Sequence, residues 1–213
     1  MHRTEGHMST PESNVFKGIY GRAKKPEDLP WNHAVPTLLL PGITETHQKP
    51  GKALDIGCGS GIDSIFLAKQ GWEVTSLDFM QEALEMTRKR AAEAGVTLEF
   101  VQADVTSWSR SEPFDIILDA GVLHNMKPVR YPAYRERILS WLTQDGDFLL
   151  HHHEKRHALD WRPIGPRRVS PANIRKFFAP ELTQKDYTRR VTNGVPLPVG
   201  PSIAAAHYWF RRS

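Results

Sequence analysis

The 213-residue chain has little cysteine and no long apolar run, and both absences narrow its class. A single cysteine, Cys58, excludes an internal disulfide framework and suits a reducing compartment, so we expect a cytoplasmic protein. No stretch approaches the roughly 20 apolar residues that a membrane helix needs, so no membrane partner is expected. The first residues lack the apolar core of a signal peptide, and residues 1–7 resemble the remnant of an expression tag.

The net charge is only +4 at pH 7, but the basic residues are unevenly distributed along the chain. Between residues 151 and 190 there are ten lysines and arginines against four acidic residues. Such an excess could attract an anionic substrate or a nucleic-acid backbone, whereas a solvated face balanced by acids elsewhere is the ordinary interpretation. The composition therefore leaves the partner open.

Residues 1–50 differ from the rest because they are irregular and rich in proline. Short helices are expected near 12–23 and around 31–40. From residue 51 onward, strand and helix patterns alternate regularly. We interpret 1–50 as a cap or lid segment and 51–213 as the main domain.

The alternating pattern predicts an α/β fold. Strands are expected at 52–56, 73–78, 97–102, 114–119, 148–152, 182–190 and 204–212, and helices at 62–70, 81–94 and 133–142, with another beginning at Pro171. Strands that alternate with helices indicate a doubly wound sheet with right-handed crossovers. The last two strands have no clear helix between them, which predicts that they pair antiparallel to each other.

A glycine-rich loop, DIGCGSG over 55–61, follows the first of these strands and begins a helix. Its three glycines let a ligand approach the main chain, because no side chain stands in the way. Asp78 closes the next strand, 21 residues after Gly57, where a carboxylate can accept hydrogen bonds from both ribose hydroxyls of an adenosine cofactor. The loop and Asp78 together predict a cofactor that contains adenosine.

Charge and spacing separate this loop from those that bind dinucleotides. The third glycine of the G-x-G-x-x-G fingerprint is replaced by Ile62. Asp63 then stands at the helix start, where a pyrophosphate needs a free N-terminus. Together with Asp55, it places negative charge around the loop, which suits the sulfonium and ammonium groups of S-adenosylmethionine. The chain also lacks a G-x-x-x-x-G-K-[ST] phosphate loop.

Residues after the third and fourth strands complete the expected cofactor site. Asp104 can accept the adenine amino hydrogen, or it can be a surface carboxylate that caps a turn. Cys58 is interpreted as packing, because no motif pairs it with a base. The candidate cofactor contacts are Trp31, Asp55, Gly57, Cys58, Gly59, Gly61, Asp78, Phe79, Ala103, Asp104, Val105, Asp119, Ala120 and Gly121.

These motifs resemble those of the class I S-adenosylmethionine-dependent methyltransferases over residues 52 to about 150. Within the class, the chain is most similar to the thiopurine, tellurite and thiol methyltransferase group. The similar segments are Pro30-Trp31, the run DIILDAGVLHN over 115–125, and IGPRRVS over 164–170. The chain departs at Arg167, where a second proline is usual, and at the histidines 151–153.

The resemblance implies a Rossmann-like, three-layer, seven-stranded sheet with a reversed last strand. It also implies methyl transfer from S-adenosylmethionine to a small-molecule acceptor, with release of S-adenosylhomocysteine. The glycine loop then approaches the methionine part, Asp78 holds the ribose, and Trp31 covers the cofactor or, alternatively, packs in the core.

Candidate acceptor residues lie at the carboxyl ends of the fourth and fifth strands. A hydroxyl or amine acceptor must lose a proton and needs a base, whereas a thiolate does not. Strand alternation places His151 and His153 on one face and His152 on the other. The predicted catalytic residues are His124, His151 and His153, and the predicted substrate contacts are Trp31, His124, His152, Arg162, Arg167 and Arg168. Ordinary alternatives are a histidine bonded to the loop backbone, a polar strand end and surface arginines.

No metal is expected, because the histidines lack a matched carboxylate set at ligand spacing. The leading hypothesis is an enzyme that methylates a thiol, nitrogen or hydroxyl group of a small molecule, anionic compounds included, and acts as a monomer or homodimer. The alternatives are a nucleic-acid methyltransferase and a non-catalytic protein that binds S-adenosylmethionine. Nucleic acid is not the expected partner, because the sequence DAGV over 119–122 stands where base methylators carry an Asn/Asp/Ser-Pro-Pro-aromatic motif.

Overall fold

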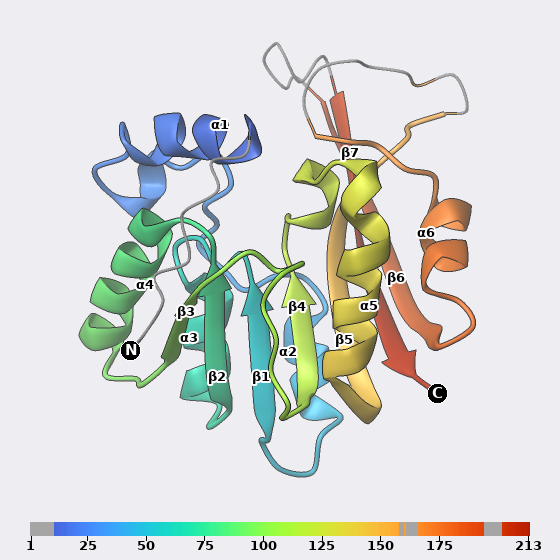
Figure 1. Ribbon diagram of the computed structural model, residues 1–213, viewed down its shortest axis with the longest axis horizontal. Coiled ribbons are helices and arrows are strands. Elements are labelled where there is room, and N and C mark those ends of the chain that lie inside the picture. Colours follow the sequence, from blue (N-terminus) through green and yellow to red (C-terminus); the bar gives the residue numbers. More distant parts are fainter. Residues whose placement is uncertain (1–10, 158–159, 161–165, 194–201) are drawn as a thin grey trace.

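The computed structural model describes residues 11–157, 160, 166–193 and 202–213 (Figure 1). In this part of the chain a seven-stranded sheet has the order β3-β2-β1-β4-β5-β7-β6. The strands are β1 (Lys52–Ile56), β2 (Glu73–Asp78), β3 (Glu99–Gln102), β4 (Phe114–Asp119), β5 (Leu142–Glu154), β6 (Leu182–Asn193) and β7 (Ser202–Arg212). Neighbours from β3 to β5 are parallel, and β7 is antiparallel to both β5 and β6.

Helices cover both faces of the sheet and produce three layers (Figure 1). They are α1 (Pro11–Tyr20), α2 (Leu40–Glu45), α3 (Ile62–Lys69), α4 (Gln81–Ala94), α5 (Tyr131–Trp141) and α6 (Pro171–Phe178), with short 3₁₀ turns at Pro26–Asp28, Leu123–Asn125 and Pro128–Arg130. One core joins α5 and α6 to the sheet, and a second joins α2, α3 and α4 to it. A buried parallel sheet needs apolar residues on both faces, which is why β1 and β4 are almost continuous apolar runs.

The helix ends follow the chemistry of their terminal residues. Gly95 ends α4 in the left-handed conformation, with φ of 68°. Ser170 precedes α6, and its side chain accepts a hydrogen bond from the Asn173 backbone N–H, while Pro171 occupies the first helical position. These local signals fix the loops at which the elements reverse direction.

The structure confirms the predicted doubly wound sheet with a reversed last strand, as well as the antiparallel pairing of the final two strands. The helix expected around 31–40 is wrong, because α2 begins only at Leu40. Pro36 disfavours helical backbone at the residue before it, and Thr37 instead bonds to Asp63. Strand β5 is longer than the expected 148–152, because it pairs with β4 on one side and with β7 on the other. The described helices include none long and apolar enough to cross a membrane.

The N-terminal segment lies above the carboxyl ends of the strands, next to α4 (Figure 1). Tyr20 and Leu29 from this segment form a small core with Met80 and Ala83 at the start of α4. Trp31 packs against the same core. Burial of these side chains holds residues 11–31 against the edge of the sheet where the glycine loop lies.

Candidate functional site

The glycine loop between β1 and α3 depends on glycine for both conformation and space. Gly57, Gly59 and Gly61 have φ values of 68°, 56° and 78°. A Cβ atom on Gly57 would lie 2.4 Å from Cγ2 of Val122, and one on Gly61 would lie 2.5 Å from Cγ2 of Thr87. Other residues would be strained and would clash with these side chains, so the fold requires glycine at both positions.

Asp78 joins the end of β2 to this loop. Its Oδ2 accepts a hydrogen bond from the Gly59 N–H at 3.1 Å, and its Oδ1 accepts one from the Met80 N–H at 2.9 Å. Burial raises the pKa of Asp78 to about 6. Each carboxylate oxygen has a second lone pair, so Asp78 can still accept hydrogen bonds from a ligand.

Two further carboxylates fix the start of α3. Asp55 Oδ2 accepts a hydrogen bond from Ser64 Oγ at 2.6 Å, and burial raises the pKa of Asp55 to about 8. Asp63 accepts hydrogen bonds from the Thr37 N–H at 2.7 Å and from Thr37 Oγ1 at 2.6 Å. Burial also raises the pKa of Asp63. The observed partners of both acids belong to the protein, and the predicted cofactor contact of Asp55 stays a prediction.

Aromatic side chains from the N-terminal segment cover the glycine loop. Trp31 Nε1 lies 3.5 Å, and the Tyr20 hydroxyl 3.6 Å, from the position that a Cβ on Gly59 would take. Asn32 Oδ1 accepts a hydrogen bond from Ser60 Oγ at 2.8 Å. Trp31 thus packs in the small core beside Gly59, as the alternative interpretation expected, and its role as a cover over the cofactor stays a prediction. The structure adds Tyr20, which no motif in the sequence marks.

Phe79 and Cys58, which lie beside the loop, pack against other side chains of the protein. Phe79 contacts Phe16 edge-to-face, with ring centroids 5.7 Å apart. Cys58 is buried, its Sγ lies 3.7 Å from Thr87 Oγ1, and burial raises the pKa of its thiol well above the usual value. A thiol held protonated is a poor nucleophile, which agrees with the packing interpretation.

The segment after β3 borders the expected adenine position. The Ala103 N–H donates to the Asp78 carbonyl at 3.1 Å, and Val105 is buried. Asp104 Oδ1 accepts hydrogen bonds from Thr106 and pairs with Arg130. Burial alone would raise the pKa of Asp104, but these hydrogen bonds outweigh it and lower the pKa. Asp104 therefore caps a turn, and its contact with adenine stays a prediction.

Asp119, at the end of β4, organises the loop that follows. Its Oδ1 accepts hydrogen bonds from the N–H groups of Gly121 at 2.8 Å and Val122 at 2.6 Å. Its Oδ2 accepts from the Leu123 N–H at 3.0 Å and from the Tyr134 hydroxyl at 2.5 Å. The side chain is fully buried. Both oxygens of Asp119 serve to shape the loop, and its predicted contact with the cofactor stays a prediction.

Five histidines gather beside this loop and are called the histidine cluster. They are His124 in the 3₁₀ turn after β4, His151, His152 and His153 on β5, and His207 on β7. The rings of His124 and His153 have centroids 4.3 Å apart. His151 and His207 are cross-strand partners whose rings stack at 4.6 Å with planes 12° apart.

The cluster is uncharged at neutral pH. Burial lowers the pKa of every member, and repulsion between neighbouring imidazoles lowers it further for most of them. The pKa falls to about 4 for His152 and to about 3 for His153 and His207. Each ring also has one buried nitrogen without a hydrogen-bond partner in the described part of the chain. Unpaired buried polar atoms are costly, and their concentration here indicates a ligand site.

The three predicted arginines have different surroundings. Arg168 is buried and pairs with Asp160 at 3.2 Å, so its charge already has a partner in the fold. The Arg167 N–H donates to the His124 carbonyl at 2.8 Å, while its side chain is exposed. Arg162 lies outside the described residues. Of the three, only Arg167 is shown to border the cluster with an exposed charge.

Next to the cluster, Glu154 forms the buried centre of a polar network that the sequence did not reveal. Its carboxylate accepts hydrogen bonds from Tyr187, Tyr208 and Arg189. His207 was likewise missed, because its approach to His151 depends on strand pairing. The described residues contain no group of three or more His, Cys, Asp or Glu side chains placed to hold a metal ion.

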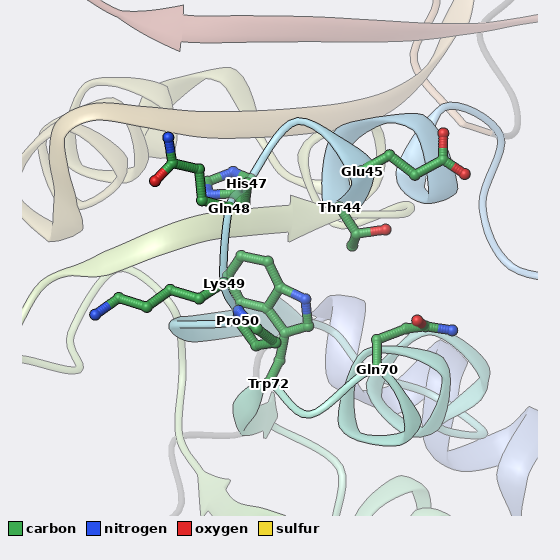
Figure 2. A pocket seen from close by; sticks show the side chains of 8 residues that line it. All are labelled: Thr44, Glu45, His47, Gln48, Lys49, Pro50, Gln70 and Trp72. Atoms are coloured by element: carbon green, nitrogen blue, oxygen red, sulfur yellow. The ribbon is translucent and has the colours of Figure 1, made fainter.

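A surface cavity of about 200 Å³ lies away from all these residues (Figure 2). It is lined by Thr44, Glu45, His47, Gln48, Lys49, Pro50, Gln70 and Trp72. These residues come from the last turn of α2 and from the segments that precede β1 and β2, at the opposite end of these strands from the glycine loop. None of them is a predicted site residue, so we assign the candidate site by its chemistry and not by this cavity.

Comparisons with known proteins agree with this geometry. Residues 53–146 match the model of a family described as a methyltransferase domain. The chain is 26% identical over 195 residues to 2-heptyl-1-hydroxyquinolin-4(1H)-one methyltransferase of Mycobacteroides abscessus, which covers 88% of this chain and 85% of that protein. It is 28% identical to thiocyanate methyltransferase 1 of Arabidopsis thaliana over 63% of this chain, but spans only 61% of that protein.

A solved structure supports the same fold over almost the whole chain. It is the Burkholderia thailandensis 1,6-didemethyltoxoflavin-N1-methyltransferase, with bound 1,6-didemethyltoxoflavin and S-adenosylhomocysteine. The TM-score is 0.68 at 23% identity, and the alignment covers 99% of this chain and 93% of that one. At this identity the likeness extends to the fold.

Proposed function

We propose that this chain is a class I S-adenosylmethionine-dependent methyltransferase and that it methylates a hydroxyl or ring nitrogen of a small heteroaromatic acceptor. The acceptor binds at the histidine cluster, and S-adenosylhomocysteine is released. The observation that carries the proposal is the gathering of five neutral imidazoles beside the loop that contacts the glycine loop, each with one buried nitrogen that has no hydrogen-bond partner among the described residues.

The residues present fit the methyl donor. The three glycines give the loop a left-handed backbone that carries no side chains, and Asp78 retains lone pairs for the ribose hydroxyls. When bound, S-adenosylmethionine supplies a methyl group on a positively charged sulfur. Trp31 and Tyr20 cover the loop and exclude water from it. We accordingly propose that residues 1–50 act as a cap over the main domain, 51–213.

The loop after β4 links the donor side to the acceptor side. Val122 contacts Gly57 on one side of this loop. On the other side, the Ala120 carbonyl bonds to the His151 ring at 3.2 Å, and Gly121 lies against the His124 ring. Asp119 fixes the loop between them. An acceptor at the cluster is therefore held close to the glycine loop, which supplies the proximity that a displacement reaction requires.

The neutral imidazoles favour an acceptor that bears a proton. A neutral ring nitrogen can accept a hydrogen bond from a hydroxyl or ring N–H and then take the proton. It offers no positive charge to an anion such as a thiolate. The Mycobacteroides relative, named for a hydroxyquinolinone, supports a protic ring compound, whereas the Arabidopsis relative, named for thiocyanate, keeps a soft anion as the second candidate.

A methyl-transfer screen with isotopically labelled S-adenosylmethionine tests the proposal. The panel contains hydroxylated heteroaromatic compounds, phenols, alkyl thiols, thiocyanate and short oligonucleotides. We expect label in the heteroaromatic compounds and none in the oligonucleotides. Methylation of thiols or thiocyanate alone would show that the acceptor assignment is wrong. Cofactor binding by calorimetry without transfer to any compound would identify a non-catalytic binding protein instead.

A further inference from the structure

The His151 ring is held in one orientation by a backbone carbonyl. Its Nδ1 lies 3.2 Å from the Ala120 carbonyl oxygen, in the loop after β4. A carbonyl oxygen has only lone pairs, so the hydrogen of this bond must be on Nδ1. In a neutral imidazole the other nitrogen, Nε2, then carries a lone pair. The Ala120 carbonyl therefore fixes the tautomer of His151.

The lone pair that this tautomer leaves on Nε2 is not used within the fold. Nε2 of His151 is buried and has no hydrogen-bond partner in the described part of the chain. Leaving a buried acceptor unpaired costs about 1–3 kcal/mol, so its retention indicates a partner that is not part of the fold. This partner must donate a hydrogen bond, because Nε2 can only accept one.

Two of the other cluster members, His124 and His152, are less suited to receive a proton from a ligand. His124 and His152 are the most deeply buried of the cluster residues. The His152 ring bonds to the His153 carbonyl at 2.7 Å and belongs to the face of β5 that also carries Glu154. His151 is only partly buried, and its ring bonds to the loop whose Val122 contacts Gly57. The ring of His207 stacks on the ring of His151.

We propose that Nε2 of His151 accepts the proton of the acceptor, and that the Ala120 carbonyl thereby selects acceptors that bear a hydrogen on the reacting oxygen or nitrogen. This inference rests on the proposed function. The new bond joins that atom to the methyl carbon as the carbon–sulfur bond breaks. The proton moves to Nε2 of His151 and then to solvent, so charge and atoms balance. His207 is a positioning residue, because it holds the His151 ring by stacking.

Nitrogen NMR of the free protein tests the tautomer without any turnover. In ¹⁵N-histidine-labelled protein at pH 7, we expect a protonated, pyrrole-type Nδ1 and a bare, pyridine-type Nε2 for His151. The His151→Gln variant assigns the signals by their loss. A bare Nδ1 with a protonated Nε2 would overturn the inference, since Nε2 would then be a donor.

Kinetics with two acceptors of the same ring skeleton test the proton transfer. One acceptor keeps its hydroxyl proton at the assay pH, and the other carries electron-withdrawing groups and is already ionised. The His151→Asn variant keeps a donor near the Ala120 carbonyl but has no group at the Nε2 position. We expect it to lose about 100-fold in kcat with the protonated acceptor and less than threefold with the ionised one.

A matched variant separates binding from proton transfer. His151→Gln places an amide near the Nε2 position that can bond to the acceptor but cannot take its proton. We expect its KM to stay within threefold of the wild type while kcat with the protonated acceptor falls as far as in His151→Asn. Equal losses of kcat with the protonated and the ionised acceptor would overturn this inference but leave the proposed function standing. If the wild type methylates neither acceptor, the proposed function fails, and this inference fails with it.

Discussion

The glycine loop and the histidine cluster face each other across one loop but are built in opposite ways. The glycine-loop side comes from one stretch of chain, β1–α3–β2, and its carboxylates already hold hydrogen bonds from the fold. The cluster comes from three distant segments, around residues 124, 151–153 and 207, and each of its rings has a nitrogen without a partner in the described part of the chain. The carboxylates of the glycine-loop side therefore have hydrogen-bond partners within the protein. Each histidine ring of the cluster still has a nitrogen for which the described residues offer none.

This difference matches the two ligands of a methyltransferase. The methyl donor is the same molecule in every turnover, so its site can be fixed by backbone conformation and by a carboxylate that the fold itself holds in place. At the proposed acceptor site, the acceptor would supply hydrogen bonds that the described residues do not make, and the site holds polar atoms at a cost in stability. Four substitutions test this contrast, in order of expected effect.

Gly57→Ala should have the largest effect, confined to the donor side. The left-handed φ costs an alanine about 1–2 kcal/mol, and the contact with Val122 adds an overpacking cost of about 1–3 kcal/mol. We expect a loss of unfolding free energy of about 3 kcal/mol in urea titrations, with loss of cofactor binding by calorimetry. The double variant Gly57→Ala/Val122→Ala removes the clash and should recover part of the unfolding free energy and part of the cofactor binding. No recovery would mean that the contact with Val122 does not limit this position.

Asp78→Ala should weaken S-adenosylmethionine binding by about 10- to 100-fold, or about 1.4–2.8 kcal/mol. It removes the ribose acceptor and leaves the N–H groups of Gly59 and Met80 without their carboxylate. Because the pKa of Asp78 is raised to about 6, its acceptor capacity falls as the pH drops through that value. Wild-type affinity measured by calorimetry should therefore decrease from pH 7 to pH 5, and that of Asp78→Asn should not. A parallel pH dependence in both proteins would contradict the ribose assignment.

Tyr134→Phe tests the loop that separates the two regions. It removes one of the hydrogen bonds to the buried Asp119, so we expect a loss of about 1–2 kcal/mol of unfolding free energy. Turnover should fall more than cofactor affinity, because the loop positions His124 and His151. Ser140→Ala, on the exposed side of the same helix, is the control and should change stability by less than about 0.5 kcal/mol. Equal effects of both variants would contradict the role of Asp119.

His152→Asn should have the smallest effect on the unfolding free energy at pH 7 and a measurable effect at acidic pH. Its folded pKa of about 4 lies below the ordinary 6.5, so the unfolded chain takes up a proton first and stability is lost as the pH falls below about 6.5. Between pH 6 and pH 5 the unfolding free energy of the wild type should fall by about 1 kcal/mol more per pH unit than that of the variant. Chemical denaturation at several pH values measures this slope. An unchanged slope would show that His152 is not buried in its neutral form.

The glycine-loop side was predictable from sequence because its chemistry is local. Positive-φ glycines, Asp78 at a strand end and Trp31 before the core all lie where their motifs indicated. The hydrogen-bond partners of Asp119 could not be predicted, because nothing in the run DAGV shows that Tyr134 and three backbone N–H groups would bond to its oxygens.

By itself, the sequence determined the α/β sheet, the reversed last strand and the donor, since hydrophobic period and loop spacing are properties of neighbouring residues. Only the tertiary structure decided the acceptor side. Pairing of β5 with β7 stacks His207 on His151, and the Ala120 carbonyl then fixes which nitrogen of His151 is bare. These contacts join residues more than 30 positions apart, and such distances are set by packing of the whole sheet and not by local pattern.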